Sequence, residues 1–142
     1  MVRARGLTLI EVLIVVIVLA LLAAIITPQF SRAEQDTRLE VLKTHLLDVR
    51  AQIRLYRAQH GDRLPEIETF VEQMTQRTTQ DGQTRVNGQH EQTFGPYLES
   101  LPINPYTGEN RVSDGPVGTS DWYYDPVSGL FRANHDAAFI EY

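Results

Sequence analysis

The sequence contains no cysteine among its 142 residues. This absence excludes a disulfide scaffold, thiolate zinc sites and cysteine nucleophiles, although an exported protein can also lack cysteine. Basic charge is scarce as well, because 13 Lys and Arg residues face 18 Asp and Glu residues, for a formal net charge of −5. Proteins that bind nucleic acid usually present a basic face, so direct binding of nucleic acid is not expected.

The sequence also lacks a recognisable catalytic constellation. Its four histidines are scattered and form no H-E-x-x-H pair, and no serine stands in a nucleophile-elbow context. The glycines form no phosphate-binding loop. We therefore expect that the protein is not an enzyme.

One segment near the N-terminus is strongly apolar. Residues 12–26 form an unbroken run of 15 apolar residues, and residues 7–26 contain only Thr8 and Glu11 as polar side chains. As a helix, the longer segment extends roughly 30 Å, which is the thickness of the hydrocarbon core of a bilayer. Two arginines precede it, so the positive-inside rule predicts a cytoplasmic N-terminus and a translocated C-terminal part.

Glu11 is the anomaly within this segment. A charged side chain inside an apolar helix costs about 2.5–3.5 kcal/mol on insertion scales, and it therefore usually marks a function. The alternative is that Glu11 lies at the edge of the membrane, where water solvates it. The residues alone leave both interpretations open.

The surroundings of Glu11 resemble the N-terminal signature of type IV pilins and pseudopilins. The match consists of a short basic leader followed by Gly6-Leu7-Thr8-Leu9-Ile10-Glu11-Val12-Leu13. The resemblance implies that a prepilin peptidase removes residues 1–6 by cutting between Gly6 and Leu7, and that the new N-terminus is methylated. Leu7 stands where mature pilins usually have phenylalanine.

The same resemblance assigns roles in assembly. It implies that residues 7–30 form a transmembrane helix that becomes the core of a filament, and that Glu11 takes part in assembly. Pro28 stands where the family commonly has a proline that kinks this helix. Its missing N–H removes one helical hydrogen bond, so we expect a bend at Pro28.

Residues 31–60 predict an amphipathic helix. Their apolar residues follow spacings of three and four, which place them on one stripe of an α-helix: Leu39, Leu42, Leu46, Val49, Ile53 and Tyr56. Four basic residues, here called the basic flank, fall on one side of this stripe: Lys43, Arg50, Arg54 and Arg57. Gly61 is placed to end the helix. We expect the stripe to pack on its own domain rather than to form an exposed coiled coil.

The rest of the chain predicts a small sheet. Residues 66–76 have the spacing of a short helix, and residues 76–93 are polar and predict a loop. Aromatic segments at 122–124 and 130–134 flank a Pro/Gly turn, which indicates a β-hairpin. The expected fold is α+β, with a long N-terminal helix packed on a small antiparallel β-sheet and residues 31–142 forming a pilin-like head.

Charge is distributed unevenly over this head. Residues 31–63 carry seven basic and five acidic groups, whereas residues 64–142 carry four basic and twelve acidic groups. The basic flank and the acidic remainder could meet between neighbouring subunits. Exposed ion pairs contribute only about 0–1 kcal/mol each, so such contacts would tune the register of assembly rather than drive it.

The C-terminal block resembles the major pseudopilins of type II secretion systems. The similar segments are Leu101-Pro102, Asn104-Pro105-Tyr106-Thr107-Gly108, Trp122-Tyr123-Tyr124-Asp125 and Gly129-Leu130-Phe131-Arg132-Ala133-Asn134. In the better-known major pseudopilins a calcium ion staples the C-terminal loops. The resemblance therefore implies a Ca²⁺ site, and the plausible carboxylate ligands here are Asp114, Asp121 and Asp125. The alternative is that these three residues form a solvated acidic surface.

Together these observations predict a structural subunit of a pseudopilus filament in a type II protein secretion system. Its partners would be other copies of itself, minor pseudopilins, the prepilin peptidase and the inner-membrane assembly platform. It would cross the bacterial inner membrane once, with its head in the periplasm. Two alternatives stay open: a subunit of a surface type IV pilus used for adhesion, motility or DNA uptake, and a membrane-anchored exported enzyme or binding domain.

Overall fold

A computed structural model of the chain describes residue 6, residues 8–84 and residues 93–142, except for the side chains of residues 24–31. The chain divides into two compact units, Met1–Thr37 and Arg38–Tyr142. Among the described residues, the strands and the hydrophobic core lie in the second unit.

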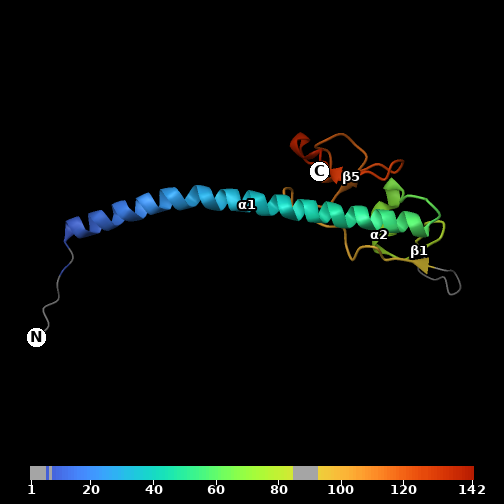
Figure 1. Cartoon of the computed structure of the whole chain (residues 1–142), viewed down its shortest axis with the longest axis horizontal. Coiled ribbons are helices and arrows are strands. Elements are labelled where there is room, and N and C mark those ends of the chain that lie inside the picture. Colours follow the sequence, from blue (N-terminus) through green and yellow to red (C-terminus); the bar gives the residue numbers. More distant parts are fainter. Residues whose placement is uncertain (1–5, 7, 85–92) are drawn as a thin grey trace, which may run out of the picture. The chain divides into compact units, whose positions relative to one another are not determined.

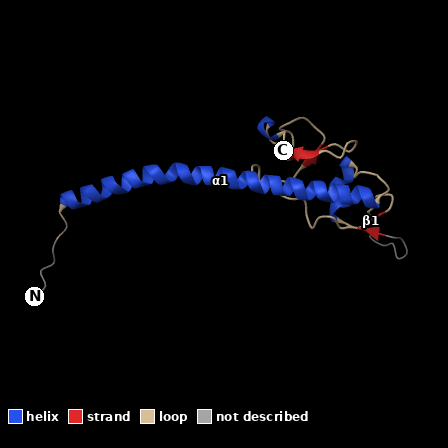
Figure 2. Cartoon of the chain, in the orientation of Figure 1, coloured by secondary structure: helices blue, strands red, loops and turns tan. Residues whose placement is uncertain are grey.

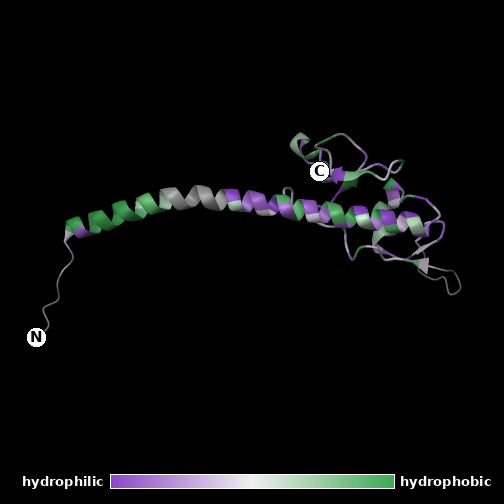
Figure 3. Ribbon diagram, viewed as in Figure 1, coloured by the Kyte–Doolittle hydropathy of each residue, from purple (hydrophilic) through white to green (hydrophobic). Residues whose placement is uncertain are grey.

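The long helix α1 spans Leu9–Gln59 (Figure 1), which confirms the predicted N-terminal helix. Figure 3 shows nearly uninterrupted apolar residues at its start and alternating polar and apolar residues along its second half. The helix is continuous through position 28. The bend predicted at Pro28 lies where the side chains are not described, and it stays a prediction.

The C-terminus of α1 is capped by a Schellman motif. The Asp62 N–H donates a hydrogen bond to the Arg57 carbonyl at 3.0 Å, and Gly61 between them has a φ of 63°. Glycine adopts this left-handed conformation without a steric penalty, so the prediction that Gly61 ends the helix is confirmed. The Arg57 guanidinium also binds the Asp62 carboxylate through two hydrogen bonds of 2.6 and 2.8 Å.

One stripe of α1 forms the helical side of the core. Five of the six predicted residues are at most 3% exposed, namely Leu42, Leu46, Val49, Ile53 and Tyr56. Leu39 is partly buried against them. Complete burial of such a side chain contributes roughly 1.5–3 kcal/mol. The stripe therefore packs on its own domain, as predicted.

A short helical segment follows α1. It begins as the 3₁₀ helix η1 (Ile67–Thr69) and continues as the α-helix α2 (Phe70–Thr75). Phe70 and Met74 are buried, so the predicted helix at 66–76 is present and its first turn is wound more tightly than expected.

The strands form two small sheets (Figure 2). In the first sheet β1 (Thr78–Thr79) pairs antiparallel with β2 (Thr93–Phe94). The second sheet has the order β3-β4-β5, formed by Val112–Ser113, Trp122–Tyr124 and Phe131–Ala133. β4 and β5 are antiparallel, which confirms the predicted hairpin. The chain then ends with the 3₁₀ helix η2 (Ala137–Phe139).

The second sheet differs in one respect from the antiparallel sheet that was predicted. β3 pairs parallel with β4. The two strands are parallel because the loop of residues 114–121 runs back along the sheet, so that β4 begins at the same end of the sheet as β3. This return places the residue before β3 beside the residue before β4.

Alternate residues of β4 and β5 face the core, as the pleat of a strand requires. Those that are fully buried are Trp122, Tyr124, Phe131 and Ala133. Phe70 of α2 packs on Tyr124 and Phe131, with ring centroids 4.4 and 5.9 Å apart. The Arg50 Nε donates a hydrogen bond to the Phe131 carbonyl at 2.8 Å, which ties α1 directly to β5.

Candidate functional site

Thr8 and Glu11 form a capping box at the start of α1. The Glu11 Oε2 accepts hydrogen bonds from the Thr8 backbone N–H and from the Thr8 hydroxyl, both at 2.9 Å. In return, the Glu11 N–H donates to the Thr8 hydroxyl oxygen at 3.3 Å. The pattern Thr-x-x-Glu before an apolar run is the sequence signal of such a cap, and it could have predicted this contact. Glu11 therefore has a partner within its own chain.

The first turns of α1 expose apolar side chains on every side. From Leu9 to Leu22, every large apolar residue is between 47% and 85% exposed. Within the residues that the structure describes, no helix is both long enough and apolar enough to cross a membrane.

The predicted processing site lies just before α1. Gly6 is exposed, and a Cβ atom added to it would meet no atom within 4 Å. A larger side chain at position 6 would therefore meet no steric obstacle among the described residues, so packing within them does not require glycine there. Leu7, the predicted first residue of the mature chain, lies outside the described residues, as does the side chain of Pro28.

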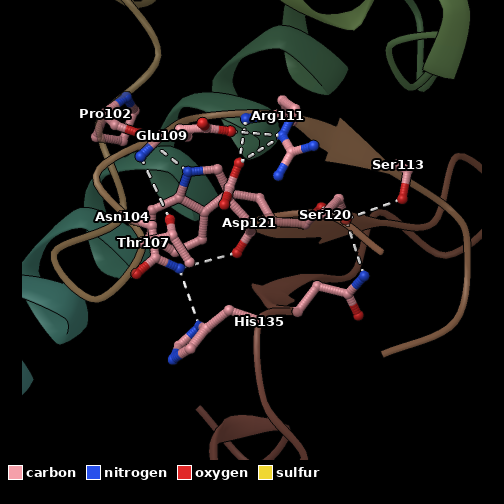
Figure 4. Close-up of polar contacts among 11 residues, drawn as sticks. Pro102, Asn104, Thr107, Glu109, Arg111, Ser113, Ser120, Asp121 and His135 are labelled. Atoms are coloured by element: carbon pink, nitrogen blue, oxygen red, sulfur yellow. Dashed lines mark hydrogen bonds and ion pairs between the residues drawn. The ribbon is translucent and has the colours of Figure 1, made fainter. Parts of the chain in front are cut away.

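Asp121 is the buried acidic residue of the C-terminal loops (Figure 4). It is 1% exposed, and its Oδ2 accepts hydrogen bonds from the Arg111 backbone N–H at 2.8 Å and from the Arg111 Nε at 3.3 Å. Burial by itself raises the pKa of a carboxyl, but hydrogen bonds from Thr107 and Arg111 outweigh it and lower the pKa of Asp121. Asp121 is therefore an ionised carboxylate whose charge is compensated from within the chain.

The other two predicted calcium ligands have different environments. Asp125 lies in the turn after β4, where its carboxylate accepts hydrogen bonds from the Val127 N–H at 2.9 Å and the Ser128 hydroxyl at 2.5 Å. Asp114 is exposed on the loop after β3. Asp121 and Asp125 flank the two ends of β4, which separates them by about 13 Å at 3.3 Å per residue.

These positions do not fit one shared calcium site. In the part of the chain that the structure describes, no group of three or more His, Cys, Asp or Glu side chains is arranged to hold a metal ion. Two of the three predicted ligands already use their carboxylate oxygens as hydrogen-bond acceptors within the chain. Calcium binding stays a prediction that this arrangement does not favour.

Two fully buried asparagines hold the loops around Asp121. The Asn104 Nδ2 donates hydrogen bonds to the Asp121 carbonyl at 2.9 Å and to the His135 Nδ1 at 3.0 Å. The Asn134 Nδ2 donates to the Ser120 hydroxyl at 2.8 Å. Neither asparagine is singled out by the sequence as a residue that holds distant loops together. Asn-Pro is a turn signal, and the Asn104 Oδ1 accepts a hydrogen bond from the Tyr106 N–H at 2.9 Å within that turn. The partners of the two Nδ2 groups come from distant loops, and no local pattern predicts them.

The basic flank of α1 is largely engaged within the chain. Lys43 forms an ion pair with Glu40 at 3.0 Å, and Arg50 donates to the Phe131 carbonyl at 2.8 Å. Arg57 binds the carboxylate at the helix cap described above. Pairing of Lys43, Arg50 or Arg57 with the acidic head of a neighbour would have to replace these contacts.

Comparisons with known proteins agree with the motif at the N-terminus. The family model of the prokaryotic N-terminal methylation motif matches residues 1–27. A relative from Pseudomonas aeruginosa, named type II secretion system core protein G, is 26% identical over 122 residues, which are 85% of this chain and 82% of the relative. No solved structure matches the chain.

The fold and the comparisons therefore point the same way. The methylation motif ends within the apolar half of α1, and the similarity to the relative extends into the head with its two small sheets. The chain thus carries the prokaryotic N-terminal methylation motif on a long helix with a small α+β head, and it is distantly similar to a protein named type II secretion system core protein G.

Proposed function

We propose that this chain is a structural, non-enzymatic subunit of a pseudopilus in a type II secretion system. The observation that carries the proposal is the exposed apolar surface of α1 from Leu9 to Leu22, on a chain whose head has a core of its own. Soluble monomers rarely leave so large an apolar surface in water. This surface needs an apolar environment, first lipid and then other copies of the same helix.

In the proposed cycle, a prepilin peptidase cuts after Gly6 and the new N-terminus is methylated. Residues 7–30 hold the subunit in the bacterial inner membrane, with the head in the periplasm, until the assembly platform moves the helix into the filament. The helix exchanges one apolar environment for another, so hydrophobic burial contributes little to this step. Specific polar contacts must therefore select where each subunit docks.

Glu11 supplies such a contact. Cleavage creates an amine at Leu7, four residues before Glu11, which is about 6 Å along a helix. If neighbouring subunits are staggered by a similar distance, the amine of one subunit meets the Glu11 carboxylate of the next. In the free subunit Thr8 binds this carboxylate, so docking transfers Glu11 from a partner in its own chain to a neighbour.

Two other functions share parts of this reasoning. A subunit of a surface type IV pilus would have the same leader cleavage, the same apolar helix and the same contact of Glu11. The similarity to a relative named as a secretion protein favours the pseudopilus over the surface pilus. A membrane-anchored enzyme or binding domain is disfavoured because pilin-like proteins are generally structural. Neighbouring genes for a secretin and a general secretion ATPase would support the pseudopilus, whereas a retraction ATPase would support a surface pilus.

Substitutions at Glu11 test the proposal in cells that express the full chain. Glu11→Gln keeps a side chain that can complete a capping box but removes the charge, whereas Glu11→Ala removes both. Asp48→Ala is the matched control, because it removes an exposed carboxylate from the same helix. A half-made ion pair in a water-poor core costs about 3–5 kcal/mol, so we expect both Glu11 variants to yield at least about 100-fold less filament.

The readouts are the ratio of pelleted filament to membrane-resident subunit, secretion of an exported reporter, and N-terminal processing by intact mass. Both Glu11 variants should still be cleaved and should abolish secretion, while Asp48→Ala behaves as the wild type. If Glu11→Gln forms filaments and Glu11→Ala does not, then Glu11 acts by capping the helix and its charge is not needed for assembly. Normal secretion together with lost motility or DNA uptake would assign the chain to a surface pilus.

A further inference from the structure

Three residues that flank strands of the second sheet lie in one row at its edge. Arg111 precedes β3, Asp121 precedes β4 and Asn134 follows β5, and the strand register aligns all three. The Asp121 N–H donates a hydrogen bond to the Arg111 carbonyl at 3.1 Å. The Asn134 N–H donates to the Asp121 carbonyl at 3.1 Å. The loops of the C-terminal half therefore converge on Asp121.

The Asp121 carboxylate needs a positive partner at this position. It is 1% exposed, and a buried carboxylate without a partner is strongly destabilising. The Arg111 Nε lies 3.3 Å from its Oδ2 and 2.8 Å from the Glu109 Oε2, so one N–H is shared between two carboxylates, and the Arg111 side chain is 67% exposed. A guanidinium in this position remains hydrated and still compensates the buried charge.

The Oδ2 of this carboxylate also accepts hydrogen bonds from donors of the chain itself. The Arg111 backbone N–H donates to it at 2.8 Å, in addition to the Arg111 Nε at 3.3 Å. A divalent cation would have to displace these donors and would place its charge next to a guanidinium, which repels it. The site is therefore built for an arginine rather than for a metal.

We propose that the Arg111 guanidinium is the built-in counter-charge that closes the C-terminal loops on Asp121. It takes the place of the divalent cation that the family resemblance implies, so that the fold of this head does not depend on calcium. This inference concerns the head alone, and it does not rest on the proposed function.

The test is thermal unfolding of the full chain in detergent, with excess chelator and with millimolar calcium. Trp122 is the single tryptophan and is fully buried beside Asp121, so its fluorescence reports on this sheet. Arg111→Gln removes the guanidinium and keeps the backbone N–H that binds Asp121. The matched control is Arg54→Gln, which removes an exposed arginine from α1.

We expect the wild type to have the same Tm in chelator and in calcium. Arg111→Gln should lower the Tm by about 5–15 °C in both conditions, and the control should change it by less than about 3 °C. A wild-type Tm that rises with calcium, or an Arg111→Gln variant as stable as the control, would overturn the proposal.

A second variant covers the case in which Arg111→Gln does not fold. In Arg111→Gln combined with Asp121→Asn, the neutral amide no longer needs a counter-charge. The proposal requires this double variant to be more stable than Arg111→Gln alone. A double variant that is equally unstable or less stable would mean that Arg111 does not act through the charge of Asp121.

Discussion

Two adjacent leucines on α1 allow a direct test of how the head is packed. Leu46 is 1% exposed, whereas Leu47 is 64% exposed. Replacing either leucine by alanine changes the helix propensity by the same small amount, so the difference between the two variants isolates burial. Leu46→Ala leaves a cavity against the sheet, and Leu47→Ala removes atoms that are already largely in water.

The expected magnitudes differ by several-fold. A buried Leu→Ala substitution costs about 2–5 kcal/mol of unfolding free energy, and an exposed one usually changes it by about 0.5 kcal/mol or less. In a domain of this size, 1 kcal/mol shifts the Tm by roughly 4–8 °C. We therefore expect Leu46→Ala to lower the Tm by at least about 8 °C and Leu47→Ala by at most about 4 °C.

The assay is thermal unfolding of the full chain in detergent, followed by the fluorescence of Trp122. Two equal losses would mean that the stripe on α1 is not the side that faces the sheet. A larger loss from Leu47→Ala would mean that the face of the helix that carries Leu47 is the buried one. Either result would refute the packing described above.

Two further predictions concern processing and pH. Replacing Gly6 by a bulky or charged residue should leave the leader attached, which intact-mass analysis detects as an unmethylated chain that still contains residues 1–6; a wild-type chain that starts beyond residue 24 would instead indicate an ordinary signal peptide. Burial lowers the pKa of His135 below its usual value of about 6.5, so the folded state favours the neutral imidazole. The contribution of His135 to the free energy of unfolding is complete above pH 6.5. It declines as the pH falls below 6.5, because the unfolded chain then binds a proton at His135 that the folded chain does not bind. When the pH is lowered from 7 to 5, the urea concentration at the midpoint of unfolding should decrease less in His135→Gln than in the wild type. Equal decreases would exclude His135 as the source of the pH dependence.

Much of the helical architecture can be predicted from local sequence. The stripe that contains Leu46 has a period that matches the α-helix, and Gly61 at its end is suited to the left-handed cap. The hairpin of β4 and β5 is also local, because its turn lies between two aromatic segments. The capping box of Thr8 and Glu11 is equally local, because the three-residue spacing of Thr and Glu before an apolar run is enough to predict it. Such features depend on residues a few positions apart, whose geometry the backbone itself imposes.

The environment of the three acidic residues depends instead on contacts between distant segments. Asp114, Asp121 and Asp125 are close in sequence and suggest one cluster, but β4 separates two of them and the third remains exposed. The pairing of Asp121 with Arg111 exists because β3 and β4 run parallel, an arrangement that no local spacing predicts. Long-range strand pairing selects which carboxylate is buried and which cation reaches it, and for this reason only the tertiary structure could show that Asp121 is buried beside an arginine.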